Sequence, residues 1–204
     1  MMRRATALAV SLACAATIAG CRINVDKNAN GEEKNVQVDT PFGGVHVNTN
    51  QTSAADLGFP AYPGAQQVKD GDHKSADVRL GFGDWQLRVR VASYATSDTS
   101  DQVAGFYRKE LGRYGTVITC QGNTPVGTPT VTSEGLTCAD SENTKIQMDQ
   151  KTNGYAPNGL VLKAGSKRHQ HIVGFDHPEA GKTKFALVAL DLPASGSKQG
   201  SKSD

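Results

Sequence analysis

The stretch from Asp77 to Tyr94 constrains the fold more than any other part of the chain, because it predicts a β-hairpin of defined register. Gly83-Asp84 is a two-residue loop with glycine first, which suits a type II′ turn. With this turn, three apolar pairs face each other on one side of the hairpin: Phe82 with Trp85, Leu80 with Leu87, and Val78 with Val89. A slip of one residue would move every apolar side chain to the opposite face. We therefore expect one face of this hairpin to be core.

The other face of the same hairpin is rich in arginine. Asp77 is expected opposite Arg90, an attractive pair, and Arg79 opposite Arg88, a repulsive one. The three arginines could bind an anionic surface such as a polymer or a lipid head group. A solvated sheet face is the simpler interpretation.

One amphipathic helix is predicted after the hairpin, over about residues 98–114. Thr99 and Gln102 match a capping box, in which each residue bonds the backbone of the other. Apolar side chains then recur at helical spacing: Val103, Phe106, Tyr107, Leu111 and Tyr114. We expect this helix to lie across the apolar face of the sheet.

Most other segments predict strands. Period-two valines on both sides of the turn at 41–44 predict a hairpin over 34–49, and Pro60, Pro63 and Gly64 mark a connection after it. Further strands are expected within 116–120, 130–138, 145–148, 160–163, 169–175 and 184–192, and the last is apolar on both faces and so central. Together these elements predict an α+β fold, a mostly antiparallel β-sheet with one amphipathic helix packed on it.

The first 20 residues have the layout of a secretory signal peptide. Arg3 and Arg4 precede an apolar run of 14 residues, from Ala5 to Ile18, whereas a membrane-spanning helix needs about 20. Small residues close the run before Cys21. The segment is therefore expected to direct export and not to span the bilayer.

The four residues Ile18-Ala19-Gly20-Cys21 resemble the lipobox of bacterial lipoproteins. The resemblance implies that the Cys21 thiol receives a diacylglyceryl group and that Cys21 becomes the first mature residue. Two or more acyl chains give a lasting membrane anchor. Arg22 stands where an aspartate favours retention in the inner membrane, so the outer membrane facing the periplasm is expected. The alternative is ordinary secretion, with cleavage near Ala13-Cys14-Ala15.

The cysteines support export. Of the four, Cys14 leaves with the signal peptide and Cys21 is expected to be acylated, which leaves Cys120 and Cys138. A single pair in an oxidising compartment predicts a disulfide. A metal thiolate site is the alternative, but the chain has no CxxC motif.

Loss of Arg3 and Arg4 lowers the 22 basic side chains to 20, equal to the 20 acidic ones. The mature chain thus lacks the basic excess of a nucleic-acid-binding protein. We divide the chain into the signal peptide (1–20), an N-terminal tether or hairpin (21–55), an α+β domain (56–193) and a polar, disordered tail (194–204).

Two patterns are weak candidates for metal ligands. Asp26, Asn28 and Asn30 fit the front half of a calcium loop, but Gln37 occupies the position of the bidentate glutamate, and an Asn-Gly turn explains the same residues. His169 and His171 lie on one side of a strand, with His177 as a conceivable third ligand. They can equally mark the edge of a core face.

No motif for catalysis or for a cofactor emerges. We expect a lipid-anchored cell-envelope protein that is not an enzyme and binds or scaffolds an envelope protein or polymer. The alternatives are a metal-binding envelope protein and an envelope enzyme whose site the sequence does not reveal. The membrane, reached through Cys21, is the one partner that the sequence itself indicates.

Overall fold

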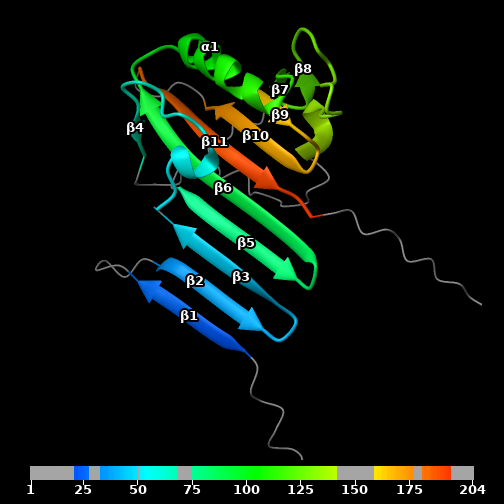
Figure 1. Cartoon of the computed structure of the whole chain (residues 1–204). Helices are drawn as coiled ribbons and strands as arrows, with labels where there is room; N and C mark the ends of the chain where they lie inside the picture. The colour runs from blue at the N-terminus through cyan, green and yellow to red at the C-terminus, as the bar shows by residue number, and fades with distance from the viewer. Residues whose placement is uncertain are drawn as a thin grey trace, which may run out of the picture.

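The computed structural model describes residues 21–27, 33–49, 51–68, 75–141, 159–176 and 181–193. They form one antiparallel sheet with a single α-helix and short 3-10 turns packed on it (Figure 1). The predicted α+β fold is therefore confirmed. The expected signal peptide, the tail and the strand at 145–148 lie outside the described residues.

The sheet has eleven strands, in the order β1-β2-β3-β5-β6-β11-β10-β9-β7-β8, and β4 pairs separately with β6. The strands are β1 (Arg22–Lys27), β2 (Glu33–Thr40), β3 (Gly43–Thr49), β4 (Gln66–Gln67), β5 (Ala76–Phe82), β6 (Trp85–Thr96), β7 (Ile118–Gln121), β8 (Thr124–Pro125), β9 (Leu160–Gly165), β10 (His169–Phe175) and β11 (Thr183–Asp191). Strand β11 lies between β6 and β10, which confirms that it is central.

The hairpin of β5 and β6 has the predicted register. All three apolar pairs are present, and Asp77 is opposite Arg90 and Arg79 opposite Arg88. The hairpin of β2 and β3 is also confirmed, with Pro41 and Phe42 in its turn. Strand β3 then pairs with β5, so segments 21–55 and 56–193 contribute to one continuous sheet.

Helix α1 (Ser100–Leu111) begins at the predicted N-cap. The backbone N–H of Gln102 donates to Thr99 Oγ1, and the N–H of Thr99 donates to Gln102 Oε1, which completes the capping box. A 3-10 turn, Gly112–Tyr114, continues the helix. Val103, Tyr107 and Leu111 are fully buried, so the predicted apolar stripe is the face that packs.

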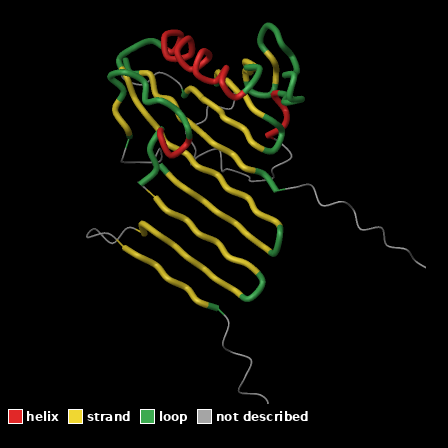
Figure 2. Tube along the Cα trace, viewed as in Figure 1, coloured by secondary structure: helices red, strands yellow, loops and turns green. Residues whose placement is uncertain are grey.

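The predicted position of the helix is wrong. The helix lies over one end of the sheet (Figure 2). The face that it covers is not that of Leu87 and Val89 but the opposite one, where β6 presents Ala92 and Tyr94. The physical reason is that the arginine-bearing face of β6 becomes apolar at Ala92 and Tyr94, which pair with Leu187 and Phe185 of β11, and the helix packs on that part of the sheet. Each face therefore has its own hydrophobic cluster.

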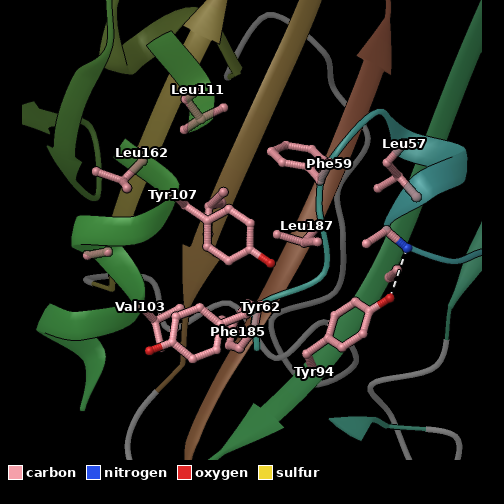
Figure 3. Packing of buried hydrophobic residues seen from close by; sticks show 14 of the residues in the cluster. Leu57, Phe59, Tyr62, Tyr94, Val103, Tyr107, Leu111, Leu162, Phe185 and Leu187 are labelled. Atoms are coloured by element: carbon pink, nitrogen blue, oxygen red, sulfur yellow. Dashed lines mark hydrogen bonds between the residues drawn. The ribbon is translucent and has the colours of Figure 1, made fainter. Parts of the chain in front are cut away.

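The cluster under the helix also includes the connection between β3 and β4 (Figure 3). Leu57, Phe59 and Tyr62 are buried there, although the prolines of this segment exclude a long regular element. Tyr94 ties the segment down, because the Ala54 N–H donates to the Tyr94 hydroxyl at 2.8 Å. Burial raises the pKa of Tyr107 and keeps its hydroxyl protonated, and that hydroxyl donates to the Pro60 carbonyl.

The cluster on the opposite face contains the predicted disulfide between Cys120 and Cys138. It joins β7 to the 3-10 turn Cys138–Ser141, next to Ile118, Ile172 and Val188. Both sulfur-bearing residues are nearly inaccessible to solvent. The bond thus closes a loop over the edge of the sheet.

The prediction of a strand within 130–138 is wrong, because this segment forms turns. The Leu136 N–H donates to Thr132 Oγ1, and the Thr132 N–H donates to the Leu136 carbonyl, which closes a compact turn. Gly135, with φ of +79°, allows the chain to reverse there. A threonine side chain that bonds the nearby backbone competes with strand pairing.

Replacement of both Cys120 and Cys138 by alanine is expected to lower the free energy of unfolding by about 3 kcal/mol, because the disulfide closes a loop of 18 residues. Urea unfolding followed by circular dichroism measures the change. Reductant should destabilise the wild-type protein by a similar amount and leave the double variant unaffected. Equal stability of the two oxidised proteins would contradict this role for the bond.

Candidate functional site

Seven polar side chains form a straight row across the face of the sheet that carries the helix. Each is the direct register partner of the next, and we call them the polar row: Asn24, Gln37, His46, Arg79, Arg88, Asp191 and His169. The row crosses strands from both ends of the chain. The sequence analysis singled out Arg79, Arg88 and His169 but not the row itself, because the joining of the strands depends on long-range pairing.

Asp77 lies beside the row and neutralises the repulsion between its two arginines. Arg88 donates from Nε and Nη2 to the two carboxylate oxygens at 3.0 and 2.7 Å, and Arg79 Nη2 donates to Oδ2 at 3.0 Å. Burial alone would raise the pKa of Asp77, but its bonds with Arg88 and Arg79 outweigh burial and lower the pKa. The predicted pairing with Arg90 holds for the backbone only, since the ion pairs are with Arg79 and Arg88.

Arg90 instead connects the sheet to the segment above it. Its Nη1 donates to the Asp56 carbonyl, and its Nη2 donates to Asp191 Oδ2 at 3.3 Å. The other oxygen of Asp191 lies 2.9 Å from His169 Nδ1. Arginine and histidine thus share one carboxylate at the end of the polar row.

The polar row continues to the N-terminal strands through His46, whose Nε2 lies 2.9 Å from Asp39 Oδ1. The hydrogen bond from Gln37, and then that from His46, lowers the pKa of Asp39. Asp39 therefore remains ionised at neutral pH. The acidic groups along the row are already paired, whereas Arg79 keeps 54% of its side chain exposed.

His171 lies at the rim of the helix-side core. Its ring stacks on Tyr114, with centroids 3.5 Å apart and planes 8° apart, and Phe59 contacts it edge-on. Burial first, and the nearby charge of Arg90 second, lower the pKa of His171 to about 4. The imidazole is therefore neutral at pH 7, and among the described residues its buried Nδ1 has no hydrogen-bond partner.

The histidine pair does face one side of β10 as predicted, but the two rings have different surroundings. His169 bonds Asp191 at the sheet surface, and His171 is inside an aromatic stack. Across the segments that the structure describes, no three His, Cys, Asp or Glu side chains gather in a way that could hold a metal ion. His177 lies outside the described residues.

Of the predicted calcium ligands, only Asp26 is within the described residues. It lies in strand β1 opposite Asn35, on an exposed, extended backbone. Gln37, at the last position of the supposed loop, is in β2 and its amide donates to Asp39. Asn28 and Asn30 lie outside the described residues.

Cys21 comes immediately before β1, and its thiol is exposed and separate from the disulfide. Among the described residues, no helix has the length and apolar composition that crossing a bilayer requires. The thiol is thus accessible at the start of the edge strand.

Comparison of the chain with known protein families, with curated proteins and with solved structures finds no match.

Replacement of Asp77 by asparagine is expected to destabilise the protein by about 1–2 kcal/mol, because a charged acceptor of three hydrogen bonds is lost and two arginines then face each other unneutralised. Urea unfolding at low and high salt measures the effect. The matched control is Asp84→Asn in the exposed β5–β6 turn, for which a change within about 0.5 kcal/mol is expected. Equal effects of the two substitutions would argue against a stabilising role for the ion pairs of Asp77 with Arg79 and Arg88.

His171 is expected to make stability depend on pH between about 6.5 and 4. Its pKa is about 4 in the folded protein and about 6.5 in the unfolded chain, so within this window only the unfolded chain binds the proton. Stability should therefore fall by about 1–2 kcal/mol as pH drops from 6.5 to 4.5, allowing for partial solvent screening of the ring. Thermal or urea unfolding across this range measures the slope.

His171→Phe should remove most of that slope, because phenylalanine keeps a flat ring against Tyr114 but cannot titrate. His169→Gln, at the exposed sheet surface, is the control and should preserve it. Asp39 and Asp77 also have lowered pKa values, but their effect on stability appears only as pH falls toward and below their ordinary pKa of 3.8. They therefore contribute little to the slope between about pH 6.5 and 4.5. A slope unchanged in His171→Phe would refute the assignment.

Proposed function

We propose that this protein is a lipid-anchored component of the bacterial cell envelope whose folded domain binds or scaffolds another envelope component without catalysis. The observation that carries the proposal is Cys21, which ends a lipobox-like segment in the sequence and has an exposed thiol in the structure. An acylating enzyme needs such a thiol to be accessible. Arg22 at the next position favours the outer membrane, facing the periplasm.

The non-catalytic part of the proposal is supported by the charge states of three groups, Asp39 and Asp77 beside the polar row and the buried His171. General acid–base catalysis works best with a group whose pKa is near the operating pH. Here arginines hold Asp77 ionised, hydrogen bonds hold Asp39 ionised, and burial holds His171 neutral. These groups are arranged to keep one charge state at neutral pH.

The polar row is the surface that the sheet offers to a partner. Its carboxylates are occupied by intramolecular bonds, while guanidinium and imidazole groups remain partly exposed. A surface with spare donors and satisfied acceptors complements phosphate or carboxylate groups. An anionic envelope polymer is the partner class that this chemistry fits best.

Cys21→Ser is expected to abolish acylation and to move the protein out of the membrane fraction after cells are broken and washed with salt. The intact mass of the wild-type mature protein should match a chain beginning at Cys21 plus a diacylglyceryl group and, in many species, a third acyl chain. Cys14→Ser is the matched control, because Cys14 lies in the segment expected to be removed, and this variant should behave as wild type.

Two results together would overturn the proposal. One is release of the wild-type protein from membranes by salt alone, and the other is an N-terminal mass without acyl addition. A protein that is acylated but released only by detergent supports it.

A further inference from the structure

Three exposed aromatic side chains gather at one end of the sheet, and we call them the aromatic tip: Phe42, Phe82 and Trp85. They are 85%, 52% and 40% exposed, and they are the exposed large aromatic residues of the described chain. Trp85 is also the single tryptophan of the protein. Exposed apolar residues grouped at one place, unlike single scattered ones, are typical of surfaces that contact a partner or a membrane.

Strand pairing explains why the three residues meet. Phe42 is in the turn between β2 and β3, and Phe82 and Trp85 flank the turn between β5 and β6. Gly43, next to Phe42, is the register partner of Phe82, which in turn is opposite Trp85. Both turns lie at the same end of the sheet, on the right in Figure 1.

Cys21 lies at this same end. Strand β1 starts with Arg22, whose register partner Asp39 is one residue from the end of β2. Four strand spacings of about 4.8 Å separate β1 from β6, so the thiol and Trp85 are roughly 19 Å apart along the sheet edge. Ile23, 68% exposed, adds an apolar side chain close to Cys21.

Pairing within the hairpin does not account for the whole group. The rings of Phe82 and Trp85 are 5.9 Å apart, and such a cross-strand pair stabilises a hairpin by itself. Phe42, however, projects from a two-residue turn with most of its surface in water. The pairing of Phe82 with Trp85 therefore does not explain the exposure of Phe42.

We propose that the aromatic tip inserts into the head-group region of the bilayer to which Cys21 is attached, so that the protein is held at two places. This inference rests on the proposed acylation of Cys21. Since no residues separate Cys21 from β1, acyl chains on its thiol bring this end of the sheet to the membrane surface. Tryptophan is enriched at bilayer interfaces, and tryptophan and phenylalanine side chains form the buried apolar face of proteins that lie in the interface.

The emission of Trp85 reports the docking directly. The full acylated protein is reconstituted into vesicles of phosphatidylethanolamine and phosphatidylglycerol, with and without bromine atoms on the acyl chains. We expect a shift of Trp85 emission to shorter wavelength on reconstitution and a loss of intensity with brominated lipid. Phe42→Ser should reduce both effects, whereas Val126→Ser, which replaces an exposed valine outside the tip, should change neither.

The outcomes separate this inference from the proposed function. If mass spectrometry shows acylated Cys21 but Trp85 emission is insensitive to brominated lipid, the docking is refuted and the lipoprotein assignment stands. If no acyl group is found, the proposed function fails whatever Trp85 reports. If emission shifts with protein concentration before vesicles are added, and ultracentrifugation shows dimers, the tip is a contact between two copies and the membrane docking is overturned.

Discussion

The pairing of strand β6 with β5 on one side and β11 on the other joins the N-terminal and C-terminal strands into one sheet. Its first seven residues pair with β5, and its residues from Arg88 onward pair with β11 without a register shift. Because side chains alternate with a period of two, the register of β6 with its two neighbours determines which side chains of those strands lie on each face of the sheet. The N-terminal strands, the polar row and both hydrophobic clusters all follow from it.

The two faces of β6 change character along its length, and this change positions the rest of the domain. Near the turn, one face is apolar and the other carries Arg88 and Arg90. Beyond Arg90 this second face becomes apolar too, with Ala92 and Tyr94. The helix covers the second region, and the arginines remain at its border. Arg90 joins the two regions, since its guanidinium bonds both Asp191 on the sheet and the Asp56 carbonyl in the connection above it.

Local patterns predicted the elements well, and long-range contacts explain what they missed. The glycine-first turn and alternating residues of 77–94 were sufficient for the β5–β6 register, and Thr99 with Gln102 for the start of α1. The face that α1 covers could not be predicted from the hairpin alone, because α1 packs mainly on β9 and β10, which come much later in the sequence. The stack of Tyr114 on His171 joins residues far apart in sequence, so the spacing of the histidines alone could not reveal a buried ring.

The direct passage from Cys21 into β1 has a mechanical consequence for an anchored protein. In a lipoprotein with a long flexible linker after the acylated cysteine, the folded domain can move freely, and the distance of its binding surface from the membrane varies. Here the polar row lies three residues from the tip on both β5 and β6, which corresponds to roughly 10 Å along a strand. A chain fixed in this way would sample a thin layer just above the lipid, so its partners would be those that come to the membrane.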